Sequence, residues 1–212
     1  GELHSVSPTK SVWADTPAHV CGFKNYDEDT MLVATDVNSS ETGFVYKWDW
    51  RTDEYEQIGG SGRQWGTHDI QWAADGSDKF WIGQPTDCGT DQNISLVDAV
   101  TGYTWAHLKA GTECTDVNHS QMLEDDSVAL VSEHGDDSFV KYNVSAHFHH
   151  GREQIYKIGG ASGTWPIVDF DTSVEYPPGT TVWSGQHNAE YMGEDEIWMY
   201  DNQGLGNNSR LL

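Results

Sequence analysis

The sequence contains few cationic residues and no long apolar run. Lys and Arg total 11 against 34 Asp and Glu, which gives a formal net charge of −23. This charge repels phosphate backbones and anionic lipid headgroups. No stretch approaches the about 18 to 20 apolar residues that a membrane-spanning helix requires. We therefore expect neither nucleic acid nor membrane as a partner.

The acidic residues lie in short clusters spread along the chain, such as residues 27–29 and 194–196. Solvated turns explain such clusters better than calcium sites do, although calcium stays open as an alternative. We predict no cofactor and no bound metal.

Cysteine is also scarce, with only Cys21, Cys88 and Cys114. Three widely spaced cysteines fit neither a disulfide scaffold nor a zinc module. The repeat described below places Cys88 and Cys114 in loops of one unit. We predict a disulfide between these two, which would stabilise the fold by about 3 to 4 kcal/mol, and an unpaired thiol at Cys21.

The motif Asn-x-Ser/Thr occurs five times, where average composition would give roughly one or two. This excess indicates a secreted, extracellular glycoprotein. Asn118 precedes a histidine that we expect to face inward, so we predict that Asn118 stays unmodified. We predict N-linked glycans at Asn38, Asn93, Asn143 and Asn207.

Aromatic residues are abundant although the hydrophobic fraction is only 36%. The chain has 10 Trp, 9 Tyr and 6 Phe, and large aromatic side chains favour sheets over helices. A length of 212 residues is enough for one domain with a real core.

An internal repeat begins at each of four histidines. Each segment has a histidine, a short strand, an acidic or glycine-containing turn such as Asp75-Gly76, and an apolar strand. This pattern predicts a β-hairpin. The spacings between the histidines are 49, 51 and 68 residues. The segments start at His19, His68, His119 and His187.

A second pair of strands follows three of these hairpins, at residues 43–60, 94–108 and 139–160. Four strands per unit and a period of about 40 to 50 residues are typical of β-propeller blades. A β-sandwich would not explain why the histidine recurs at one register. We expect residues 161–183, rich in Pro and Gly, to form a surface loop.

The predicted fold is therefore all-β, a single propeller domain or propeller fragment over residues 1–212. Its four blades open near residues 19, 68, 119 and 187. Four blades can close a small propeller. The chain ends where the third strand of the last unit is expected, which favours two alternatives: a larger, for example six-bladed, ring, or a ring that another chain completes with its own strands.

The recurring histidines would meet at one axis, because the first strand of each blade lines the central channel. Gathered imidazoles can act as acids, bases or nucleophiles, or they can merely seal the channel by bonding the next blade. A metal site is less well supported, because histidines about 50 residues apart do not show the short ligand spacing by which metal-binding motifs are recognised. We expect His134 and the histidines at 147–150 to lie in solvated turns.

The same histidine segments resemble a known family. Residues 185–203 open with Gln186-His187-Asn188 and close a hairpin with Tyr200-Asp201-Asn202. This pattern is similar to the arylsulfotransferase signature, and residues 116–160 and 65–72 resemble earlier blades of that family.

The resemblance implies a propeller enzyme that moves a sulfuryl group from a phenolic ester to another phenol through a sulfated histidine. His187 matches the nucleophile of that scheme. His68 and His119 match the histidines that stabilise the sulfuryl oxygens and handle protons. The predicted substrate-binding residues are Gln121, Asn188, Asp69 and Arg63.

Two positions depart from the family pattern. The chain has His119-Ser120-Gln121 where the family has His-x-Asn, and residues 131–134 end in Glu133-His134 where the family has an arginine. A carboxylate in place of a guanidinium repels sulfate. The alternative is a pseudoenzyme, a non-catalytic extracellular structural or binding protein that forms a homo-oligomer or filament.

A third reading is carbohydrate binding by exposed tryptophans such as Trp65, Trp165 and Trp183. We rank it lowest, because most tryptophans of a propeller pack between its blades.

Overall fold

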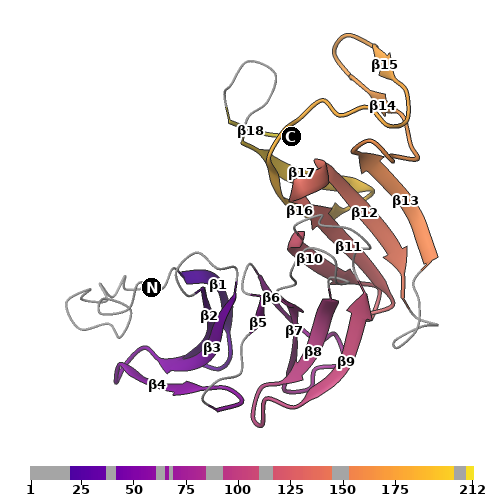
Figure 1. Ribbon diagram of the computed structural model, residues 1–212. Helices are drawn as coiled ribbons and strands as arrows, with labels where there is room; N and C mark the ends of the chain where they lie inside the picture. Colours follow the sequence, from indigo (N-terminus) through magenta and orange to yellow (C-terminus); the bar gives the residue numbers. More distant parts are fainter. Residues whose placement is uncertain are drawn as a thin grey trace.

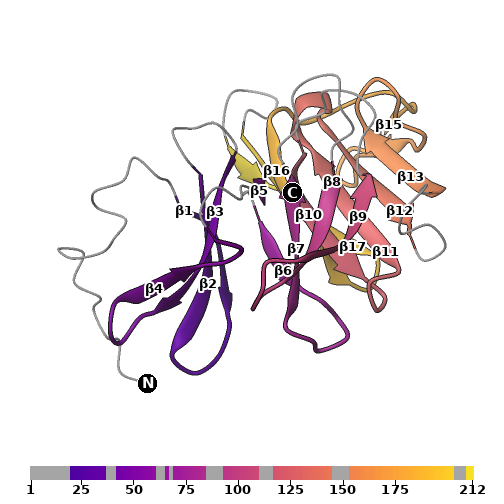
Figure 2. The same ribbon diagram turned by 60° about the horizontal axis from the view of Figure 1, so that its bottom comes forward.

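The computed structural model describes residues 20–36, 42–60, 65–66, 69–84, 93–109, 117–144, 153–202 and 209–212. These residues form antiparallel sheets that follow one another in chain order along an arc (Figures 1 and 2). Within these ranges the one helical piece is η2 (His134–Asp136), a single 3₁₀ turn. No helix of the described chain could cross a membrane.

Three of the sheets contain four strands that pair in chain order, as in propeller blades. The first sheet consists of β1 (Val20–Asn25), β2 (Thr30–Asp36), β3 (Thr42–Asp49) and β4 (Glu54–Gln57). The second sheet consists of β6 (Ile70–Trp72), β7 (Lys79–Gln84), β8 (Asn93–Asp98) and β9 (Thr104–Lys109). The third sheet consists of β10 (Val117–Leu123), β11 (Val128–Glu133), β12 (Ser138–Asn143) and β13 (Glu153–Gly159).

The fourth sheet has three described strands, which are β16 (Gln186–Gly193), β17 (Glu196–Asp201) and β18 (Arg210–Leu211). The all-β prediction, the hairpins after the recurring histidines and the second strand pairs are thereby confirmed.

Two small elements lie outside this repeat. The two-residue strand β5 (Trp65–Gly66) pairs with β3. The expected surface loop contains a short hairpin of β14 (Ile167–Val168) and β15 (Glu175–Tyr176), which projects beyond β13 (Figure 1). The end of this segment is not a surface loop, because Trp183 is buried and stacks on Phe139.

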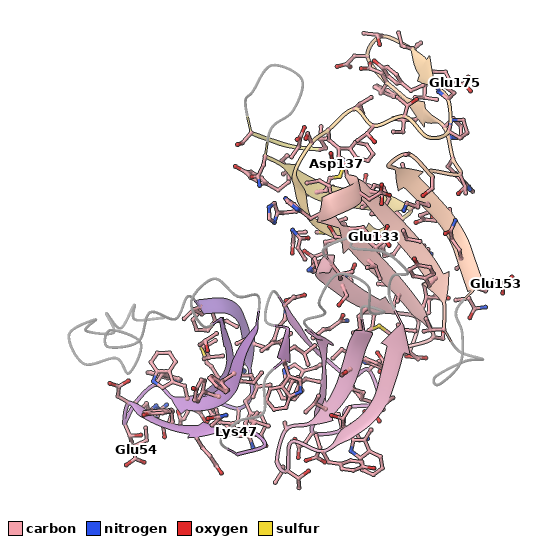
Figure 3. All side chains as sticks on the ribbon, in the orientation of Figure 1. Lys47, Glu54, Glu133, Asp137, Glu153 and Glu175 are labelled. Carbon is pink, nitrogen blue, oxygen red and sulfur yellow. The ribbon has the colours of Figure 1, made fainter. Side chains whose placement is uncertain are left out.

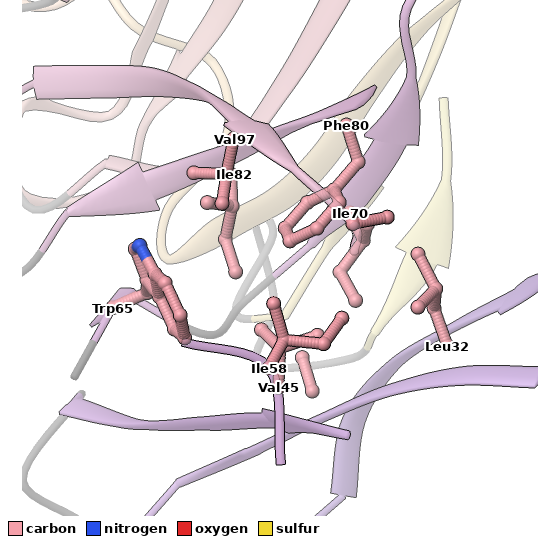
Figure 4. Close-up of a cluster of buried hydrophobic side chains, with 10 residues drawn as sticks. Leu32, Val45, Ile58, Trp65, Ile70, Phe80, Ile82 and Val97 are labelled. Carbon is pink, nitrogen blue, oxygen red and sulfur yellow. The ribbon is translucent and has the colours of Figure 1, made fainter. Parts of the chain in front are cut away.

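The hydrophobic core lies between successive sheets. Leu32, Val45 and Ile58 of the first sheet face Ile70 and Phe80 of the second (Figure 4). A second cluster joins the second and third sheets, and a third joins the third and fourth. The alternating strands thus bury one face against each neighbour, the arrangement by which blades of a propeller pack.

The tryptophans follow the same rule. Trp65 is fully buried and Trp183 is nearly so, whereas Trp165 is half exposed. The carbohydrate-binding reading, which was ranked lowest, requires Trp65 and Trp183 to be exposed, whereas both rings are buried as expected for tryptophans that pack between blades. This finding removes most of the basis for a tryptophan-lined carbohydrate site.

Candidate functional site

The candidate site lies where β10 and β16, the first strands of the third and fourth sheets, pack against each other. Each strand contains an irregular register at its histidine: between Val117 and His119 in β10, and between His187 and Glu190 in β16. A β-bulge re-aims side chains and is common beside functional sites. The bulge in β10 leaves Asn118 without a directly paired residue on β11.

His187 contacts residues from the third sheet. The side-chain amide nitrogen of Asn118 makes a short hydrogen-bonding contact with His187 Nδ1. The His134 ring, from η2, lies 4.7 Å from the His187 ring between centroids, with the planes tilted by 53°. His134 is therefore part of the site, and the expectation that it merely faces solvent is corrected.

His119 turns the other way, toward the second sheet. Its Nδ1 lies 3.0 Å from Oδ2 of Asp69, and Oδ1 of Asp69 lies 3.9 Å from Nζ of Lys24. The Asp69–His119 pair is within ion-pair distance, but its angles fall outside those of a regular hydrogen bond. His119 is 8% exposed, and its Nε2 has no hydrogen-bond partner within the described chain.

The strand that carries His187 is fixed at its start by buried polar side chains. Gln186 is fully buried, accepts a 2.6 Å hydrogen bond from Ser132 Oγ and donates one of 2.8 Å to the Ser138 carbonyl. Asp137 accepts a 2.5 Å hydrogen bond from the Gly185 amide. His187 thus stands on a rigid backbone held by the third sheet.

Gln121 spans the same two sheets rather than pointing at a histidine. Its amide nitrogen donates to the Tyr191 carbonyl at 3.2 Å, and its amide oxygen accepts from the Tyr191 N–H at 2.6 Å. Both polar ends of this side chain are engaged by the backbone of β16. Its predicted substrate contact would require giving up this pair of bonds.

A buried ion-pair cluster surrounds Glu133, the last residue of β11, directly before His134. Figure 3 labels Glu133. Nζ of Lys157 lies 2.8 Å from Glu133 and 2.6 Å from Asp136. Burial alone would lower the Lys157 pKa, but the hydrogen bonds and charges of Asp136 and Glu133 outweigh it and raise that pKa above its ordinary value. Glu133, which stands where the family resemblance implies an arginine, is therefore charge-paired.

Several predicted residues lie outside the described chain. They are His68, Arg63, Cys88, Cys114, Asn38 and Asn207. The predicted disulfide, two of the glycans and two of the site residues therefore stay predictions. The side chain of Asn93 is not described, and Asn143 is half-buried at the end of β12.

Asn188 adopts a left-handed backbone conformation with φ 55° at the bulge of β16, and its exposed amide lies 3.5 Å from Glu190. Asn118, by contrast, is 6% exposed. The sequence analysis assigned Asn118 no role in the site. The sequence signal that could have identified Asn118 as a site residue is its position directly before the recurring histidine His119.

Within the described residues, no group of three or more His, Cys, Asp or Glu side chains is arranged to hold a metal ion. The site can instead supply three imidazoles (His119, His134 and His187), the amide of Asn118 and the carboxylate of Asp69. These groups can exchange protons and hydrogen-bond a small polar ligand.

Comparison with known proteins names no family. No family model and no curated protein matches the chain. Among solved structures, a luciferin-regenerating enzyme is 11% identical, with 87% of this chain and 69% of that chain covered and a TM-score of 0.38. An uncharacterized protein from Listeria monocytogenes EGD-e is 10% identical, with 93% of this chain and 54% of that chain covered, also at 0.38. Scores this low leave the function to be inferred from the residues of the chain itself.

Proposed function

We propose that this chain belongs to a secreted, arylsulfotransferase-like β-propeller that transfers sulfuryl groups between phenolic compounds through a histidine. One observation carries the proposal. His187 and the neighbouring pair Asn118 and His119 come from different sheets, 69 and 68 residues apart in the sequence, yet Asn118 contacts His187. The first strands that carry His119 and His187 thus pack against each other, as strands that line one channel would.

The chemistry needs no cofactor. An imidazole nitrogen with a free lone pair attacks the sulfur of an aryl sulfate, the sulfur–oxygen ester bond breaks, and the phenolate leaves and takes up a proton. The acceptor phenol then attacks the sulfur of the sulfohistidine and loses its proton to a base, and the nitrogen–sulfur bond breaks. The sum converts one aryl sulfate and one phenol into the exchanged pair, with a neighbouring N–H donor stabilising the sulfuryl oxygens.

The acidity around the site does not exclude an anionic substrate. Glu133 is 3% exposed and shares Lys157 with Asp136. An ion-paired carboxylate repels sulfate far less than a free one, because the ammonium cancels much of its field at close range. The net charge of −23 acts mainly at longer range, where salt screens it.

Incubation with 4-nitrophenyl sulfate and phenol tests the proposal. We expect release of 4-nitrophenol and a mass increment of one sulfuryl group on a histidine-containing peptide. His119→Gln and His187→Gln should each lower turnover by about 10²-fold or more. A control variant, His107→Gln, lies outside the site elements, on β9. Absence of both turnover and adduct in the wild-type protein would sink the proposal.

A second candidate is the non-catalytic structural or binding protein, and the fourth sheet favours it. Trp198, Tyr200 and Met192 are each about half exposed on its strands, and apolar side chains on a sheet surface favour association. Light scattering and electron microscopy test this reading. Rings or filaments without sulfuryl transfer would support it, and a monodisperse, active monomer would refute it.

A further inference from the structure

We infer that His119 and His187 hold opposite tautomers, so that His119 supplies the attacking lone pair and His187 donates a hydrogen bond. The inference rests on the proposed function for its chemical meaning, but the tautomers themselves follow from the side chains around the two rings. It exchanges the roles that the family resemblance implies for these histidines.

The tautomer of His119 follows from Asp69. The Asp69 carboxylate carries only lone pairs and a negative charge, and it lies 3.0 Å from Nδ1 of His119. At that distance the charge favours a proton on Nδ1 over a lone pair there, even though the angle is not that of a regular hydrogen bond. This tautomer leaves Nε2 as the nitrogen with a lone pair when the ring is neutral. That Nε2 is buried and has no hydrogen-bond partner within the described chain.

The tautomer of His187 follows from Asn118. The amide nitrogen of Asn118 contacts Nδ1 of His187, and an NH₂ group can only donate. Nδ1 then acts as the acceptor, so the neutral ring carries its proton on Nε2. A ring of this tautomer donates from Nε2 and cannot attack through that nitrogen. Asn118 and Asp69 are thus positioning residues, each of which acts through a histidine.

The division of roles suits sulfuryl transfer. Nε2 of His119 forms the bond to sulfur, while Nε2–H of His187 donates to a sulfuryl oxygen as negative charge builds there. When the ester bond breaks, the phenolate oxygen takes its proton from solvent, because a neutral imidazole is too weak an acid to give one up. When the acceptor phenol attacks, its proton goes to solvent, because Nδ1 of His187 already accepts from Asn118.

Nitrogen-15 NMR of the histidine-labelled protein tests the tautomers without reference to activity. The two resonance sets are assigned from His119→Gln and His187→Gln. We expect the proton on Nδ1 for His119 and on Nε2 for His187 near neutral pH. The reverse tautomer at either ring would overturn the inference.

Substitutions separate positioning from structural effects. Asn118→Asp presents only acceptor oxygens, so it should move the His187 proton to Nδ1 and leave His119 unchanged. The matched control Asn188→Asp adds the same charge beside His187, but this side chain faces Glu190, so the His187 proton should stay on Nε2. If Asn118→Asp leaves the His187 proton on Nε2, Asn118 does not set the tautomer.

The site of the sulfuryl adduct decides the roles. We expect it on His119, and Asp69→Asn should slow its formation by about 10²-fold or more. An adduct on His187 overturns the exchange of roles while sulfuryl transfer itself stands. Correct tautomers with no adduct on any histidine would refute sulfuryl transfer and leave the tautomer assignment intact.

Discussion

At the scale of single residues, Lys157 is the most consequential buried charge that the structure describes. Its ammonium is shared by Glu133 and Asp136, and Ser138 Oγ donates to Glu133 at 3.0 Å. Lys157→Met should lower the free energy of unfolding by about 3 to 5 kcal/mol, since it leaves Glu133 buried and unpaired. Urea denaturation measures this loss.

The double variant Lys157→Met with Glu133→Gln is the control, because it removes the orphaned charge as well. It should recover most of the loss; no recovery would mean that packing, not charge, is the cause. Because the Lys157 pKa is raised above its ordinary value of 10.5, its contribution is complete below pH 10.5. It is lost as the pH rises through the folded-state pKa.

At the scale of elements, the motif Asp-x-x-Thr recurs in the turns between strands. Oδ1 of Asp49 and Asp98 each accept the amide N–H of the threonine three residues on, Thr52 and Thr101, at 3.0 and 2.7 Å. Both turns connect the third and fourth strands of a sheet. Hydrogen bonds from these amides lower the pKa of both carboxyls below the ordinary value of 3.8.

We expect these turns to make the protein acid-sensitive. A lowered folded-state pKa gives stability that is complete above pH 3.8 and is lost as the pH falls toward the folded-state pKa. Asp98→Asn keeps an acceptor oxygen but removes the titration, so its unfolding free energy should fall less between pH 5 and pH 3 than that of the wild type. An equal fall in both proteins would rule out Asp98 as a source of this sensitivity.

The elements were largely predictable from the sequence, whereas the site geometry was only partly so. Hairpins such as the one around Asp75-Gly76 follow from local turn chemistry and alternating hydrophobicity. The recurring histidine segments correctly marked the first strands, and where the histidine is described it lies in that strand, His119 in β10 and His187 in β16. The contact of Asn118 with His187 depends on a bulge and on packing between sheets, neither of which leaves a local sequence signal. His134 was missed because it lies in a 3₁₀ turn after the strand.

At the scale of the whole molecule, a glutamine side chain joins adjacent sheets at two places by a pair of hydrogen bonds to the backbone. Gln71 donates to the Met122 carbonyl at 2.8 Å and accepts from the Met122 N–H at 2.5 Å. Gln121 makes the equivalent pair with Tyr191 one sheet further on. Each glutamine amide donates to and accepts from the backbone of the first strand in the following sheet, as a paired β-strand would. The geometry of the site therefore depends on these hydrogen bonds between sheets.

Gln121→Ala should therefore loosen the joint between the third and fourth sheets, because the N–H and C=O of Tyr191 lose their partners at a cost of roughly 1 to 3 kcal/mol. Hydrogen exchange should accelerate in β16 and β17, while the first two sheets keep their protection. Gln57→Ala is the matched control, since the Gln57 amide bonds Gly60, three residues away in the sequence. If the amides of β16 exchange at the same rate in both variants, the Gln121–Tyr191 hydrogen bonds do not join the two sheets. His187 is then held against the third sheet by Gln186 and the apolar cluster alone.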